Sequence, residues 1–182
     1  MIRILTSMIL IAGLISACVP IPGDIKIDKS EFDGSTMIHM EPAWVGNSLI
    51  KFGLFRSSKM YKNEVILKVL VNGIYRFAND DSLEIKIDGE LLKPRLADGY
   101  TDYNHTSGQV FKGHYYAGSS WTLQQYVITK SDIKRMIEAK KVLVRIKFRN
   151  SFTDGNFSQG GMTTALNGFR SFILQLDNKS YY

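Results

Sequence analysis

The side chains best suited to chemistry lie scattered along the chain, and few of them share a short segment. His105 belongs to residues 97–109, the longest polar stretch, together with Asp98, Tyr100 and Tyr103. Catalysis needs a base, a nucleophile and an orienting group in a fixed arrangement. The stretch offers these residue types without a recognisable order, and we identify no catalytic residue. It predicts either a functional loop or one that is simply mobile.

Metal and cofactor chemistry have little support in the sequence. His39 and Glu41 lie two residues apart in a predicted strand, so they share one face and can form a surface pair or part of a metal site. None of the three histidines has the spacing of a His-Glu-x-x-His motif. The sequence also contains no nucleotide-binding glycine motif and no nucleophile elbow. We predict neither a metal nor a cofactor.

The single cysteine, Cys18, ends an N-terminal segment that has the pattern of an export signal. Arg3 supplies the positive charge at the start, residues 4–15 are mostly apolar, and two small residues precede Cys18. The apolar run is too short to span a hydrocarbon core of ~30 Å as a helix. We therefore predict that residues 1–17 are a cleaved leader.

The four residues Ile15-Ser16-Ala17-Cys18 resemble the lipobox, the processing motif of bacterial lipoproteins. The resemblance implies cleavage before Cys18 and a lipid on its thiol. An ordinary leader with a cysteine at this position by chance is the alternative. Val19 follows the cysteine where an Asp would favour the inner membrane. Similarity to enteric lipoproteins thus implies the outer membrane, with the domain facing the periplasm.

The net charge is mildly positive, +6 for the whole chain, and removal of the leader would take away Arg3 and no acid. A basic protein prefers anionic partners, here an acidic protein, a glycan or an anionic lipid headgroup. The export signal and the lack of a recognition motif argue against nucleic acid.

One predicted strand, Lys141–Arg149, concentrates this charge on one face. Its alternation turns Val142, Val144, Ile146 and Phe148 toward the core. The opposite face then carries Lys141, Arg145, Lys147 and Arg149. Like charges at every second residue repel one another unless acids on a neighbouring strand neutralise them, and Glu84 and Asp88 are candidates. Otherwise the row is a basic stripe suited to anionic headgroups or an acidic partner.

Alternation of apolar and polar residues dominates the mature chain and predicts strands. The clearest example runs from Val65 to Val71, and Asn72-Gly73 after it predicts a hairpin turn, with Tyr75 and Phe77 on the partner strand. Another strand over residues 83–87 precedes a turn at Asp88-Gly89. Further strands are predicted around residues 38–40, 50–54, 110–116 and 121–128.

Two segments change to the period of a helix. Thr129-x-x-Asp132 predicts a capping box, followed by a short helix that ends near Ala139. In the tail, apolar residues from Met162 to Leu176 fit a helical face, although Phe172–Leu176 also fits a strand. We favour the helix because its pattern covers more residues.

These elements predict a mainly β, α+β domain: an antiparallel β-sandwich of about seven to nine strands with a short helix near 130–140 and a C-terminal helix. The predicted organisation is a leader at 1–17, a lipidated cysteine and short tether at 18–23, and one globular domain at 24–182. A loose resemblance to uncharacterised bacterial envelope domains rests on positions between Tyr126 and Phe172, among them Asp132, Val144-Arg145 and Asp154-Gly155. It implies no known chemistry.

Two functions are compatible with this reading of the sequence. The first is a lipid-anchored, non-catalytic interaction module of the envelope that binds a protein or glycan near the membrane. The second is an envelope hydrolase acting on glycan or peptide, with carboxylates or histidines gathered by the fold. A deep cleft that holds His105 or His114 beside a carboxylate would favour the enzyme, whereas a flat or convex surface would favour the interaction module.

Overall fold

The computed structural model describes residues 21–46, 48–78, 81–97, 102–106, 109–111, 114–116, 119–160 and 164–178, and within 103–118 it describes backbone alone. These residues form thirteen strands and two helices. The mainly β, α+β class predicted from the sequence is confirmed. The number of strands exceeds the seven to nine predicted because several strands have only two or three residues.

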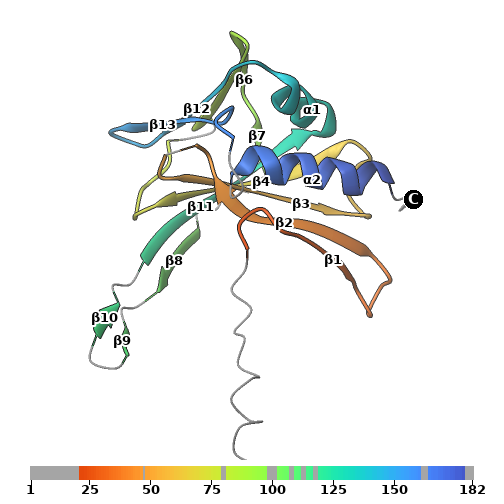
Figure 1. Ribbon diagram of the computed structural model, residues 1–182, viewed down its shortest axis with the longest axis horizontal. Coiled ribbons are helices and arrows are strands. Elements are labelled where there is room, and N and C mark those ends of the chain that lie inside the picture. The colour runs from red at the N-terminus through yellow and green to blue at the C-terminus, as the bar shows by residue number, and fades with distance from the viewer. Residues whose placement is uncertain are drawn as a thin grey trace, which may run out of the picture.

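The larger sheet has seven antiparallel strands in the order β1-β2-β3-β4-β11-β7, with β8 also paired to β11 (Figure 1). Its strands are β1 (Ile25–Lys29), β2 (Thr36–Trp44), β3 (Ile50–Ser57), β4 (Glu64–Asn72), β7 (Arg95–Leu96), β8 (Asp102–Thr106) and β11 (Ser119–Thr129).

A second antiparallel sheet has four strands in the order β13-β12-β5-β6. They are β5 (Leu83–Ile87), β6 (Glu90–Leu92), β12 (Val142–Lys147) and β13 (Phe152–Asn156). The remaining strands, β9 (Gln109–Phe111) and β10 (His114–Tyr116), pair with each other.

The alternating sequences become strands with one buried face. In β4, Val65, Leu67, Val69 and Val71 are all 0–1% exposed, and the residues between them are half-buried. In β12, Val142, Val144 and Ile146 are buried as predicted. At Asp88-Gly89 both residues have positive φ, 46° and 98°, as the predicted two-residue turn between β5 and β6 requires.

Both predicted helices are present. The helix α1 (Lys130–Glu138) begins with the predicted capping box: the Asp132 amide donates to Thr129 Oγ1 at 3.0 Å, and the Thr129 amide donates to the Asp132 carboxylate. The helix α2 (Ala165–Asn178) resolves the ambiguity of the tail in favour of a helix. It packs on β2 so closely that a Cβ at Gly168 would lie 2.6 Å from Met40 Sδ.

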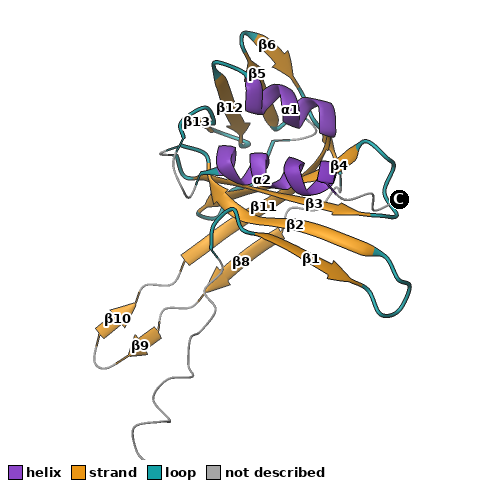
Figure 2. Cartoon of the chain, turned by 45° about the vertical axis from the view of Figure 1, so that its right-hand side comes forward, coloured by secondary structure: helices purple, strands orange, loops and turns teal. Residues whose placement is uncertain are grey.

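One core joins the sheets and helices. Figures 1 and 2 show α2 along β2 and β3, with the four-stranded sheet beside the helix. Phe52 of the larger sheet contacts Phe157, just after β13, and Phe169 of α2, at ring-centroid distances of 6.3 and 6.2 Å. In a β-sandwich, a second sheet would cover this face of the larger sheet. Here helix α2 covers part of it, so the predicted sandwich is not confirmed.

The predicted hairpin at Asn72-Gly73 is wrong. Gly73 has a positive φ of 112°, but its amide donates to Ser120 O at 2.7 Å instead of closing a turn to a partner strand. Thr122 Oγ1 donates to Gly73 O and accepts from the Tyr75 amide. These bonds direct the chain toward the second sheet, where Phe77 forms a bridge with Phe148.

The predicted polar loop 97–109 is not loop throughout, since residues 102–106 form β8 and pair with β11. Similarly, the strand predicted around 110–116 is divided between β9 and β10, which pair as a hairpin.

A buried hydrogen bond connects the two sheets. Tyr126 of β11 is 0% exposed, and its hydroxyl lies 2.6 Å from Ser82 Oγ, just before β5. Burial raises the pKa of the Tyr126 hydroxyl to about 12, against the smaller opposing effect of the Ser82 hydrogen bond. In the unfolded chain a tyrosine has a pKa of about 10.

This difference predicts a loss of stability at high pH. Between pH 10 and 12 the unfolded chain releases the Tyr126 proton while the folded protein keeps it, so the stabilisation is complete below pH 10 and falls through pH 12 by about 2–3 kcal/mol. Urea unfolding across this range should show a steeper decline for the wild type than for Tyr126→Phe. The exposed Tyr61→Phe is the control and should keep the wild-type slope; equal slopes for all three proteins would contradict the prediction.

Candidate functional site

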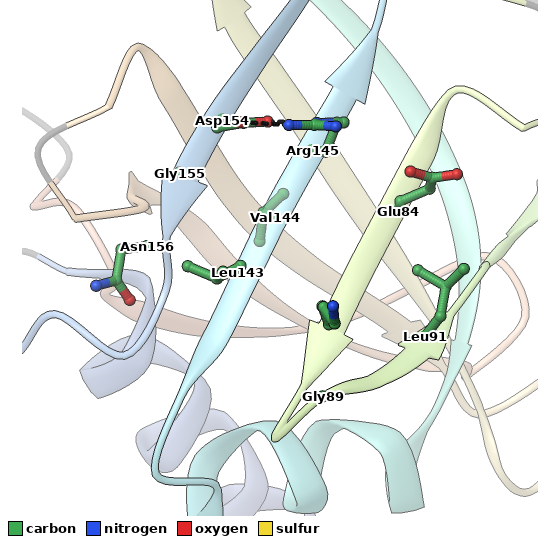
Figure 3. A pocket seen from close by; sticks show the side chains of 10 residues that line it. Glu84, Gly89, Leu91, Leu143, Val144, Arg145, Asp154, Gly155 and Asn156 are labelled. Carbon is green, nitrogen blue, oxygen red and sulfur yellow. Dashed lines mark hydrogen bonds and ion pairs between the residues drawn. The ribbon is translucent and has the colours of Figure 1, made fainter.

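The outer face of the four-stranded sheet, turned away from the core, carries a surface hollow of about 680 Å3 (Figure 3). Leu143 of β12 lies opposite Lys86 of β5 and Asn156 of β13, and Lys86 lies opposite Leu91 of β6. Facing residues in antiparallel strands share one side of the sheet, so these four form a row across it. Leu143 is 39% and Leu91 53% exposed, which leaves apolar area open to solvent.

A second row beside it consists of paired charges. Arg145 lies between Glu84 and Asp154, and donates from Nε and Nη2 to the two Asp154 carboxylate oxygens at 2.8 Å each. The Arg145 guanidinium also lies 4.3 Å from the ring centroid of Phe152, which is 60% exposed. Lys147 forms an ion pair with Glu84. The charges of this row are therefore largely matched within the sheet.

The predicted basic row is neutralised at its centre, since two of its four members, Arg145 and Lys147, have these carboxylate partners. Glu84 is a neutraliser, as the sequence suggested. Asp88 is not: its carboxylate accepts from the backbone amides of Lys140 and Lys141 at 3.2 and 2.8 Å.

The ends of the row lie outside β12. Lys141 precedes the strand and Arg149 follows it; both are exposed, and neither has an ion partner among the described residues. Consequently the continuous, uncompensated stripe that would favour an anionic membrane surface does not form on this strand.

The hollow offers poor chemistry for hydrolysis by its own carboxyls. The hydrogen bond from Arg145 lowers the pKa of Asp154, whereas a general acid that works near neutral pH needs a raised pKa. Glu84 is engaged by Lys147. These two carboxylates thus stabilise neighbouring cations, and the arrangement suits binding better than proton transfer.

The structure describes only part of the predicted loop site. Cys18, Asp98 and Tyr100 lie outside the described residues. Tyr103 and His105 lie on β8, next to β11, but their side chains are not among those described. The predicted grouping of these residues stays a prediction.

The predicted pairing of His39 and Glu41 extends to a third residue. His39 Nδ1 is 3.4 Å from Asp28 Oδ2, and Nε2 is 3.9 Å from Glu41 Oε1. Glu41 also accepts from Lys26 Nζ at 2.6 Å. Across the described part of the chain, no group of three or more His, Cys, Asp or Glu side chains is arranged to hold a metal ion.

A second feature, which the sequence analysis did not find, lies on the outer face of the larger sheet. The Lys51 ammonium lies over two neighbouring indole rings, 4.3 Å from the centroid of Trp44 and 4.4 Å from that of Trp121. Burial lowers the pKa of Lys51. Packing against the indole rings removes water from the Lys51 ammonium. Attraction between the ammonium and the indole faces offsets this loss of hydration.

No helix within the described ranges combines the length and the apolar character needed to cross a bilayer. In comparisons with known proteins, no family model, curated protein or solved structure matches this chain.

Proposed function

We propose that this chain is a lipid-anchored, non-catalytic interaction module of the bacterial envelope, held by lipid on Cys18 to the outer membrane, with its domain facing the periplasm. The hollow on the four-stranded sheet is its binding surface, and the partner there is a protein segment. The lipobox-like residues 15–18 support the anchor.

The observation that carries the binding proposal is the exposed apolar row beside matched charges. Leu143 and Leu91 remain open to solvent on a sheet face whose neighbouring Arg145 is fully paired with Asp154. Interfaces between proteins combine an apolar centre with a polar rim in this manner. Lys86, between the two leucines, is exposed and has no ion partner among the described side chains, so it favours a partner that presents a carboxylate beside an apolar group.

Photo-crosslinking from inside the hollow tests the proposal. The full chain is expressed in its own envelope with a photoreactive amino acid in place of Leu143, and a discrete adduct of higher mass is expected after irradiation. Leu174 of α2, which is 59% exposed, is the matched control position and should give no such adduct.

Charge reversal by Lys86→Glu should reduce the yield of the Leu143 adduct several-fold. Adducts of the same mass and yield from both leucines, or no adduct from either, would contradict the proposed surface. A Leu143 adduct that Lys86→Glu leaves unchanged would contradict the acidic character of the partner.

A further inference from the structure

Two turns at one end of the larger sheet form a single unit, which we name the hairpin tips: residues 29–35, from the last residue of β1 to the start of β2, and residues 58–63 between β3 and β4. Ser58 and Thr36 exchange two hydrogen bonds, at 2.9 and 3.1 Å. Lys59 Nζ lies 2.5 Å from Asp33 Oδ2, which connects one turn to the other. Because one of these interactions joins the two turns and the other two join the second turn to the start of β2, the turns keep a fixed relative position.

The hairpin tips expose aromatic rings that the fold does not use. Phe32 is 99% exposed and Tyr61 is 81% exposed. The same tips carry three exposed lysines, Lys29, Lys59 and Lys62, of which Lys59 is paired with Asp33. Aromatic rings with adjacent lysines are typical of the membrane–water interface, where rings lie among the headgroups and ammonium groups reach the phosphates.

Only a short length of chain separates Cys18 from the first strand, so the hairpin tips can reach the bilayer in which the lipid on Cys18 would be inserted. The Gly23 amide donates to Glu41 O at 3.0 Å, so the chain is fixed to the sheet from this point. The five residue-to-residue steps from Cys18 to Gly23 span at most about 17 Å, and β1, with five residues, spans about 17 Å more before the turn. Both the lipid and the tips can therefore lie in one plane. Ile21, which is 66% exposed, lies between Cys18 and the tips in the sequence.

The position of the tips also agrees with the proposed binding surface. Figures 1 and 2 show the β1–β2 turn at the right-hand side of the molecule and β12 and β13 at the left. Contact between the tips and a membrane would leave the four-stranded sheet accessible to a partner.

We propose that the hairpin tips form a second, reversible membrane contact, in which Phe32 and Tyr61 enter the headgroup layer and Lys29 and Lys62 meet lipid phosphates. The inference rests on the proposed lipid anchor. Because the anchor keeps the tips at high local concentration beside the bilayer, even a weak contact would be occupied. It would fix the orientation of the domain on the membrane.

The test uses the lipidated full chain in vesicles of phosphatidylethanolamine and phosphatidylglycerol. Lipid on Cys18 would occupy the only native cysteine, so Glu31→Cys supplies a single thiol for an environment-sensitive fluorophore beside Phe32. Glu138→Cys, at the exposed end of α1, is the matched control. Quenching by lipids brominated near the glycerol backbone should be several-fold stronger at position 31 than at position 138.

Substitution of both rings, Phe32→Ser with Tyr61→Ser, should return the signal at position 31 to its value in water, and Leu174→Ser should leave it unchanged. Both rings are exposed, so the fold does not depend on them. Equal quenching at positions 31 and 138, or quenching that survives loss of both rings, would overturn the contact.

Flotation of the vesicles, measured on the same sample, separates this inference from the anchor. Protein that does not float contradicts the lipid anchor and with it the contact. Protein that floats with an aqueous signal at position 31 contradicts the contact alone. Shielding of position 31 in the native envelope, but not in vesicles, would assign the tips to a protein partner and would likewise overturn the proposal.

Discussion

Replacement of Phe169 by alanine is expected to lower the free energy of unfolding by about 3–5 kcal/mol, as for other fully buried phenylalanines. Phe169 is 0% exposed, and its ring centroid lies 4.8 Å from that of Phe157 and 6.2 Å from that of Phe52. The three rings belong to α2, the segment after β13 and strand β3. Their contact holds the helix, the second sheet and the larger sheet together, so a cavity at this position weakens all three junctions.

Urea unfolding followed by circular dichroism measures the effect. Leu174→Ala, on the same helix but 59% exposed, is the control, and is expected to change stability by less than about 0.5 kcal/mol. Domains of this size are stable by roughly 5–15 kcal/mol, so Phe169→Ala should remove a large share of the total. A loss below about 1 kcal/mol would mean that α2 is not required to close the core.

Strands and helices could be predicted from the sequence where the residues that determine them lie close together in the chain. In β4 and β12, apolar residues at every second position determine which face is buried. The capping box at Thr129 specifies the start of α1 through bonds that span only three residues. In each case the sequence signal and the interaction that it predicts lie within the same short segment.

The failures involve partners that are distant in sequence. Asn72-Gly73 has the local preference of a hairpin turn, but Ser120 and Thr122 of β11 take the hydrogen bonds of Gly73 and Tyr75 and lead the chain away. The predicted sandwich is not confirmed: the C-terminal helix, which was itself predicted, packs on β2 and β3 as α2. A helical period indicates that one face is buried, without indicating which sheet it covers.

The candidate site was predictable in part. The alternation of residues 141–149 placed Arg145 and Lys147 on the outer face, where they are found. The partner Asp154 was not foreseen, because its position opposite Arg145 depends on the register between β12 and β13. Likewise, the apolar row of the hollow combines Leu143 with Leu91 from a strand some fifty residues earlier, and only the tertiary fold makes them neighbours.

Replacement of Cys18 by alanine is expected to have the largest effect on the protein's location: it should abolish lipid labelling and either release the protein from the membrane fraction or leave its leader incorrectly processed. Each buried methylene of an acyl chain contributes about 0.8 kcal/mol, so two or three chains on one cysteine hold almost permanently, whereas one myristoyl chain binds only marginally. In the part of the chain that the structure describes, no helix could replace such an anchor. The hairpin tips, with two exposed aromatic rings, provide at most a weak contact of their own.

Metabolic labelling with a radioactive fatty acid, together with detergent phase partitioning, measures both consequences in the same cells. Ser7→Ala, which changes the leader but leaves residues 15–18 intact, is the control and should behave as the wild type. If C18A remains labelled and partitions with the detergent, the lipid is not on Cys18 and the proposed anchor is wrong. If C18A loses its label and still sediments with membranes until the salt concentration is raised, the remaining attachment is electrostatic, as expected for Lys29 and Lys62 of the hairpin tips, because screening weakens the attraction of lysines to anionic lipid.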